Sequence, residues 1–131
     1  MRQQTLVSVV DDDESVREAL PDLIETFGFV ARAFASAEEF LASNALGDTR
    51  CLVLDVSMAT MSGPQLQAEL KRRQIHIPII FITGQDDPTL RATLRARGAV
   101  ECLCKPLRER DLRLALADAL GLDRGAGPLA D

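Results

Sequence analysis

The chain has 131 residues, of which 47% are hydrophobic and 27% charged, proportions typical of one soluble globular domain. Its 15 basic and 20 acidic side chains give a net charge of −5, which excludes a general attraction to nucleic acid or anionic lipid. No apolar run approaches the roughly 20 residues of a transmembrane helix, and three cysteines without a CxxC pair argue against a disulfide framework. Because the N-terminus also lacks a secretory signal, we expect a cytoplasmic protein that binds neither nucleic acid nor membrane.

The first half of the chain predicts two strand–helix units. An apolar run at residues 6–10 predicts a strand, and the apolar spacing after it predicts a helix. Pro21 lies about two turns into this helix and is expected to kink it. A second strand is expected at residues 29–34, and Ser36, with a glutamate three residues later, has the spacing of a capping box that begins another helix. The apolar residues whose spacing predicts the first helix are Val16, Leu20, Leu23, Ile24 and Phe27.

Three further units follow, with strands expected at residues 51–54, 77–82 and 100–104. The runs ending near residues 10, 54 and 82 are continuously apolar, which is typical of strands buried on both faces of a parallel sheet. Leucines at helical spacing follow each of the strands expected at residues 51–54, 77–82 and 100–104, and Gly98 is placed to end the fourth helix. These leucines are Leu66 and Leu70, then Leu90 and Leu94, then Leu112, Leu116 and Leu120.

Five strand–helix repeats predict an α/β fold, in which a doubly wound parallel sheet of five strands, (βα)5, is covered by helices on both faces. We assign residues 1–121 to this one domain. Residues 122–131 contain the run Gly125-Ala126-Gly127-Pro128 and are expected to form a flexible C-terminal tail or the start of a linker.

Polar side chains follow four of the five predicted strands. Asp11 and Asp12 come after the first strand, Asp55 after the third, Thr83 after the fourth and Lys105 after the fifth. Ligands of open parallel sheets bind outside the carboxyl ends of the strands. Carboxylates, a hydroxyl and an ammonium group should therefore meet at one edge.

Carboxylates that are brought together repel one another, so they require a cation or a proton. Oxygen ligands of this kind suit Mg²⁺, which typically takes one or two carboxylates and keeps several waters. An aspartate beside such a metal can attack phosphorus and form an aspartyl phosphate. Lys105 and Thr83 would then stabilise two of the phosphoryl oxygens, because catalysis of phosphoryl transfer consists mainly of positioning and electrostatics.

Four motifs together resemble the receiver domains of bacterial two-component response regulators. They are Val9-Val10-Asp11-Asp12-Asp13-Glu14, Leu54-Asp55-Val56-Ser57-Met58-Ala59-Thr60-Met61-Ser62-Gly63, Phe81-Ile82-Thr83-Gly84 and Cys104-Lys105-Pro106-Leu107. The segments 84–88 and 98–100 look most like receivers of nitrogen-fixation-type transcription regulators. The resemblance covers nearly the whole chain and implies the flavodoxin-like fold of receivers.

The resemblance implies that Asp55 is the phosphoacceptor. Asp12 would ligate Mg²⁺ directly, Asp11 through water, and Asp55 with its own carboxylate. Ser57 would contribute its backbone carbonyl to the same metal, so the identity of its side chain is not critical there.

Lys105 would contact the phosphoryl group, Thr83 would be the switch hydroxyl that moves toward it, and the peptide bond from Lys105 to Pro106 is commonly cis in this family. Two positions depart from the pattern. Ala59 replaces the usual proline after Met58, and Cys102 stands where the family usually has an aromatic switch residue. A thiol is too small for the family's coupled movement of hydroxyl and ring, so we expect either a weaker coupling between Asp55 and the output surface or a different residue in this role.

The resulting hypothesis is a phosphoryl-accepting signalling switch rather than an enzyme, apart from self-catalysed phosphorylation and dephosphorylation. Its partners would be a sensor histidine kinase or a phosphotransfer protein, and an output domain or partner protein; phosphorylation-dependent dimerisation is left open. One alternative is a binding module that no longer uses phosphorylation, which Cys102 mildly favours. A phosphohydrolase of the haloacid-dehalogenase type is disfavoured, because Ser57 stands where such enzymes carry their second aspartate.

Overall fold

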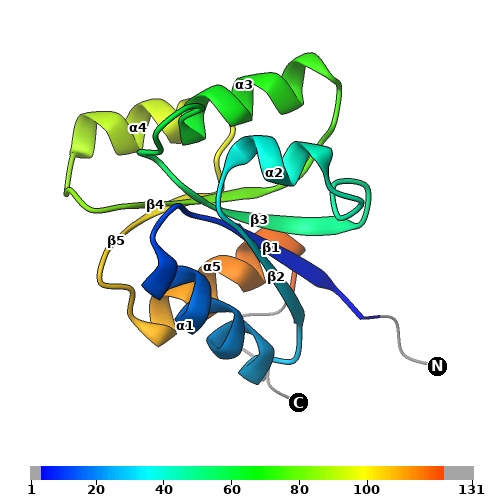
Figure 1. Cartoon of the computed structure of the whole chain (residues 1–131). Coiled ribbons are helices and arrows are strands. Elements are labelled where there is room, and N and C mark those ends of the chain that lie inside the picture. The colour runs from blue at the N-terminus through cyan, green and yellow to red at the C-terminus, as the bar shows by residue number, and fades with distance from the viewer. Residues whose placement is uncertain (1–3, 123–131) are drawn as a thin grey trace.

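The computed structural model describes residues 4–122, in which five strands alternate with five helices (Figure 1). The strands are β1 (Leu6–Val10), β2 (Val30–Phe34), β3 (Thr49–Asp55), β4 (Ile79–Thr83) and β5 (Glu101–Cys104). The helices are α1 (Glu14–Thr26), α2 (Ala37–Ala42), α3 (Gly63–Arg72), α4 (Pro88–Ala96) and α5 (Glu109–Leu120). The predicted alternation is confirmed, although β3 is longer at both ends than its apolar run. The assigned tail lies outside the described residues except for Leu122.

All strand pairings are parallel, in the order β2-β1-β3-β4-β5. Helices α1 and α5 cover one face of the sheet, while α2, α3 and α4 cover the other (Figure 1). The predicted doubly wound five-stranded sheet is therefore confirmed. Within the described part of the chain, no helix combines the length and the apolar character that crossing a membrane requires.

Two apolar layers explain why the central strands read as continuous hydrophobic runs. In β3, Cys51 and Val53 pack into the cluster shared with α1 and α5, whereas Leu52 and Leu54 pack into the cluster under α2, α3 and α4. Successive side chains of a strand point to opposite faces, so both sets of positions must be apolar. All four side chains are fully buried.

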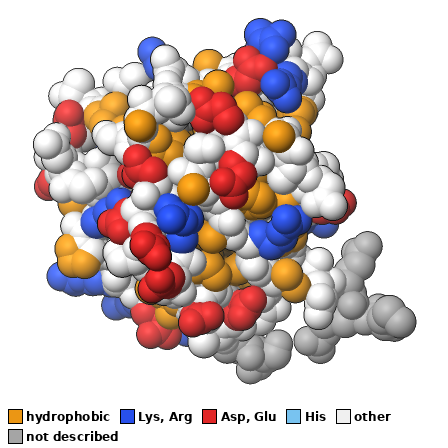
Figure 2. All heavy atoms as spheres, in the orientation of Figure 1, with side chains coloured by type: hydrophobic (Ala, Val, Ile, Leu, Met, Phe, Trp, Pro, Cys, Tyr) orange, Lys and Arg blue, Asp and Glu red, His pale blue; other side chains and the backbone are white. Residues whose placement is uncertain are grey.

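The surface of the molecule is mixed in character. On the face seen in Figure 2, acidic, basic and hydrophobic side chains are interspersed. Among residues 4–122, Leu122 is the one large hydrophobic side chain that is exposed, at 41%. The other large apolar side chains of these residues are buried or partly buried, most of them in the two core clusters or packed against them.

Helix ends follow the local sequence closely. Gly28 and Gly98, with φ of 99° and 105°, follow the last residues of α1 and α4, as expected for glycines that end helices. Pro21 lies inside helix α1, which continues to Thr26, and the kink expected at Pro21 stays a prediction. Ser36 accepts a hydrogen bond from the backbone of Glu39, as its spacing predicts.

A capping box that the sequence reading overlooked begins α3. Ser62 accepts from the backbone N–H of Gln65, and the Gln65 side chain accepts from the backbone N–H of Ser62. The signal was present as a serine followed three residues later by glutamine. This box fixes the start of α3 at the end of the loop that follows Asp55.

Gly63, the first residue of α3, lies against the end of β3. Its backbone N–H donates to the carbonyl of Val56 at 2.9 Å. A Cβ atom at this position would collide with the carbonyl oxygen of Asp55 and lie 2.9 Å from the ring of Phe81. Glycine is therefore required here for close packing, because a side chain would collide with the backbone of Asp55.

We expect Gly63→Ala to destabilise the domain by about 1–3 kcal/mol, because backbone and ring must move to make room for the methyl group. Urea denaturation followed by circular dichroism measures this change. Gly47→Ala is the matched control, since a Cβ at Gly47 meets nothing within 4 Å. Equal effects of the two substitutions would contradict the close-packing explanation.

Candidate functional site

Three aspartates meet at the carboxyl edge of the sheet. Asp11 and Asp12 follow β1 and Asp55 ends β3, and one carboxylate oxygen from each lies within 4.8 Å of the others. Asp11 is fully buried and Asp55 is 5% exposed, whereas Asp12 is exposed. The structure thus brings together the three side chains that the sequence placed at separate strand ends.

Lys105 reaches this cluster from the loop between β5 and α5. Its Nζ lies 3.1 Å from Oδ2 of Asp11 and 3.6 Å from Oδ1 of Asp55. The Lys105 backbone N–H donates to the carbonyl of Thr83 at 2.7 Å, and the peptide bond to Pro106 is cis, as expected. One ammonium group is therefore shared between two carboxylates from different strands.

The site holds more negative charge than Lys105 can neutralise. Burial first, and then the neighbouring charges of Asp11 and Asp12, raise the pKa of Asp55 from 3.8 to about 6, although Lys105 opposes the shift. Partial burial disfavours the charge of Lys105, but its contacts with Asp11 and Asp55 outweigh that effect and raise the Lys105 pKa above its ordinary value. The cluster accordingly favours a proton or an additional cation.

The loop between β1 and α1 holds Asp11 in place. Oδ1 of Asp11 accepts from the backbone N–H of Asp13 at 2.9 Å, and the guanidinium of Arg17 donates to the Asp11 carbonyl at 3.0 Å. Asp13 in turn caps α1 by accepting from Ser15, and these bonds lower the Asp13 pKa. Sequence reasoning missed Arg17, whose one signal was a basic residue in the first turns of a helix, where acids are preferred.

The donor set fits a hard divalent cation. Oδ2 of Asp11 is buried without a hydrogen-bond partner, in spite of the nearby ammonium of Lys105. Carboxylates from two strands converge on this point, and the exposure of Asp12 leaves one side open to water, which Mg²⁺ characteristically retains. Ser57 lies exposed in the loop after β3, so the metal role of its backbone carbonyl stays a prediction.

Thr83 ends β4 and is 8% exposed. Its hydroxyl accepts from the backbone N–H of Gln85 at 3.2 Å and lies 3.3 Å from the Gln85 carbonyl. The hydroxyl is thus engaged with the loop that leads into α4 rather than with Asp55. Its proposed movement toward a phosphoryl group would have to break these contacts.

Cys102 lies on β5, 5% exposed, in the apolar cluster beneath α3 and α4. Burial raises the pKa of its thiol, which keeps the sulfur protonated and unreactive. In this environment Cys102 packs as a small hydrophobic side chain. Its part in any switch stays a prediction.

The raised pKa of Asp55 predicts a specific dependence of stability on pH. Between 3.8 and about 6, the metal-free native state binds a proton that the unfolded chain has released, so stability falls as pH rises. Asp55→Asn removes the free-energy cost of ionising a buried carboxyl group. We therefore expect the variant to be more stable than the wild type by roughly 2–3 kcal/mol at pH 7. The difference should nearly vanish at a pH below 3.8.

Urea denaturation in EDTA at the two pH values measures the effect. Asp48→Asn, an exposed position on the loop before β3, is the matched control and should leave stability almost unchanged at both. A constant difference between Asp55→Asn and the wild type at the two pH values would contradict the assigned titration.

Comparisons with known proteins agree with this geometry. Residues 7–117 match the family model of the response regulator receiver domain. The chain is 44% identical over 121 residues to nodulation protein W of Bradyrhizobium diazoefficiens, covering 92% of this chain and 53% of that protein. It is 39% identical over 120 residues to the response regulator protein TmoT of Ectopseudomonas mendocina, with 92% and 54% covered. The chain thus spans about half the length of these relatives.

Solved structures show the same fold. The crystal structure of FixJ-N superposes with a TM-score of 0.80 at 35% identity, covering 92% of this chain and 96% of that one. The response regulator StyR gives a TM-score of 0.83 at 39% identity, covering 95% and 63%. The expected likeness to receivers of the nitrogen-fixation type is confirmed. The chain belongs to the family of response regulator receiver domains.

Proposed function

We propose that the chain is a phosphoryl-accepting switch in which Asp55 takes the phosphoryl group. The observation that supports this most directly is the contact of one ammonium, that of Lys105, with the carboxylates of Asp11 and Asp55. This contact lies at the carboxyl edge of the sheet, beside the exposed Asp12. The metal would be Mg²⁺, held by Asp11, Asp12, Asp55 and the backbone carbonyl of Ser57. Bound there, Mg²⁺ would supply the positive charge that draws a phosphoryl group toward the carboxylates.

The chain's own residues account for the transfer. As an anion, Asp55 attacks phosphorus with one carboxylate oxygen; an O–P bond forms while the N–P bond of a phosphohistidine breaks and its electron pair stays on the imidazole. Lys105 stabilises charge on one equatorial oxygen, and Thr83 offers a hydroxyl to another. Transfer to Asp55 and later hydrolysis to inorganic phosphate would both be catalysed by this same site.

The loop between β4 and α4 would change its contacts on phosphorylation and so transmit the state of Asp55. If the Thr83 hydroxyl bonds to the phosphoryl group, it leaves Gln85, and the loop that begins α4 is freed to rearrange. Phosphorylation would then shift a balance between two conformations. Cys102 is too small to move between two side-chain positions as an aromatic ring can. We therefore assign the coupling between Asp55 and the output surface to the contact between Thr83 and Gln85.

The donor would be a sensor histidine kinase or a phosphotransfer protein in the cytoplasm. The signal would pass to an output domain or to a partner protein, and phosphorylation-dependent dimerisation is one form that this step could take. The intact acidic site with its lysine argues against the alternative of a binding module that does not use phosphorylation.

Asp55→Asn should abolish phosphoryl uptake. Intact-protein mass spectrometry after incubation with acetyl phosphate and MgCl₂, with rapid acid quenching, should show one added phosphoryl group on the wild type and none without Mg²⁺. Asp48→Asn should be phosphorylated like the wild type. Phosphorylation of Asp55→Asn at the normal rate would overturn the assignment.

Lys105→Met should leave Mg²⁺ binding intact or tighter, since it removes a cation that competes for the same carboxylates. Phosphoryl uptake should fall by about tenfold or more, because the developing charge loses a stabilising partner, and the response to phosphorylation should weaken with it. The rise in thermal unfolding temperature with MgCl₂ reports metal binding, and mass spectrometry reports uptake.

Lys71→Met is the matched control, because it removes the chain's other lysine from the opposite edge of the sheet. Its Mg²⁺ binding and uptake should equal those of the wild type. Normal uptake by Lys105→Met would remove the role proposed for Lys105.

A further inference from the structure

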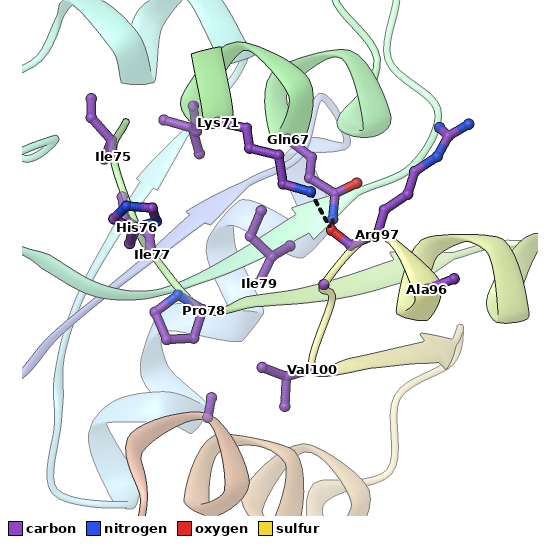
Figure 3. A pocket seen from close by; sticks show the side chains of 13 residues that line it. Gln67, Lys71, Ile75, His76, Ile77, Pro78, Ile79, Ala96, Arg97 and Val100 are labelled. Carbon is purple, nitrogen blue, oxygen red and sulfur yellow. Dashed lines mark hydrogen bonds between the residues drawn. The ribbon is translucent and has the colours of Figure 1, made fainter. Parts of the chain in front are cut away.

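A cleft of about 600 Å³ opens at the amino-terminal edge of the sheet, opposite the aspartate cluster. It lies between the C-terminal halves of α3 and α4, the segment that leads into β4, and the end of α5 (Figure 3). A volume of this size falls in the range of sites for small organic molecules. Most of its lining is apolar, and the larger apolar side chains are Leu70, Ile75, Ile77, Pro78, Ile79 and Val100.

Polar groups converge at one side of this cleft. The Lys71 ammonium and the Gln67 side-chain amide both come from α3 and both donate to the backbone carbonyl of Arg97, at 2.9 and 3.3 Å. Figure 3 shows the two side chains meeting at that carbonyl, with His76 on the other side of the cleft and the Arg97 guanidinium directed away. The carbonyl belongs to the C-cap of α4.

The hydrogen bond to the C-cap of α4 uses only part of the hydrogen-bonding capacity of Lys71. An ammonium has three N–H donors, and the bond to Arg97 takes one of them. No carboxylate of residues 4–122 pairs with Lys71, because the nearest acid on its helix, Glu69, is already engaged by Arg72 and Arg73 at 2.6 Å each. Two donors and an uncompensated positive charge thus remain at the mouth of the cleft.

The lining of the cleft contains no acidic side chain. The whole chain carries −5, yet the lining includes the ammonium of Lys71 and no aspartate or glutamate, while the Arg97 guanidinium points away. An apolar cavity with a cation at its rim is complementary to a molecule that has an apolar body and one anionic group.

We propose that this cleft is a binding site for a small organic anion with an apolar ring or chain, such as a hydrophobic carboxylate. Its anionic group bonds the free N–H donors of Lys71, and its body lies on the floor formed by Ile77, Ile79 and Val100. The site is separate in space from Asp55, since it lies at the other end of the strands.

The probe for this site is 2-naphthoate, and 2-naphthalenemethanol is its uncharged counterpart with the same ring system. Titration of the full ¹⁵N-labelled chain, followed by amide NMR, should show saturable shifts that are confined to the cleft, for example at Lys71, Gly98 and Val100. The carboxylate should bind at least about tenfold more tightly than the alcohol, because the alcohol forms no charge-assisted hydrogen bond.

Lys71→Met should weaken 2-naphthoate by about tenfold or more and bring its affinity close to that of the alcohol. Lys71→Arg should retain the preference for the anion, and Lys105→Met, which removes the distant lysine, should bind like the wild type. Phosphoryl uptake by Lys71→Met at the wild-type rate verifies that the variant is folded.

Three results would overturn the proposal. The first is equal affinity of the wild type for the two probes, which would make the cleft an apolar cavity without recognition of an anion. The second is a set of shifts centred on the aspartate edge. The third is a folded Lys71→Met variant that binds 2-naphthoate as tightly as the wild type. The first two need no variant, so the test holds even if Lys71→Met is unstable.

Discussion

The repulsion between buried carboxylates at the carboxyl edge of the sheet is the constraint on which the rest of this structure depends. Asp11 and Asp55 come from neighbouring strands, and their proximity is tolerated because Lys105 lies between them and because protonation of Asp55 is accessible near pH 6. Such a site is high in energy without a further cation. The same imbalance makes it receptive to a divalent metal and to a group that changes its charge, which are the requirements of a phosphorylation switch.

The surrounding fold holds the carboxylates in place, so their repulsion is not relieved by moving apart. Arg17 and the backbone of Asp13 fix the position of Asp11, and Gly63 lets α3 pack directly against the carbonyl of Asp55. Because β1 and β3 are adjacent and buried on both faces, the two carboxylates cannot separate without disrupting the core. The charged site is therefore held by rigid elements, while Thr83 contacts the loop that leads into α4.

The two edges of the sheet are chemically different. At the carboxyl edge, negative charge exceeds positive charge, which favours a bound cation, and this is where we propose that the phosphoryl group is taken up. At the amino-terminal edge, Lys71 lies beside an apolar cleft whose lining has no acid. Helix α4 connects the two regions, since it begins after the Thr83 loop and its C-cap carbonyl is held by Lys71 and Gln67. Any ligand that changes the position of α4 from one edge will be linked to events at the other.

The sequence by itself determined the alternation of strands and helices, the parallel sheet and the set of polar residues at strand ends. It did so because continuous apolar runs require burial on both faces, and because parallel strands bring their carboxyl ends to one edge. Only the tertiary structure decided that Lys105 lies between Asp11 and Asp55, that Gly63 must lack a side chain, and that Lys71 borders an acid-free cleft. Each of these depends on distances between segments far apart in the chain, which local propensity and spacing do not encode.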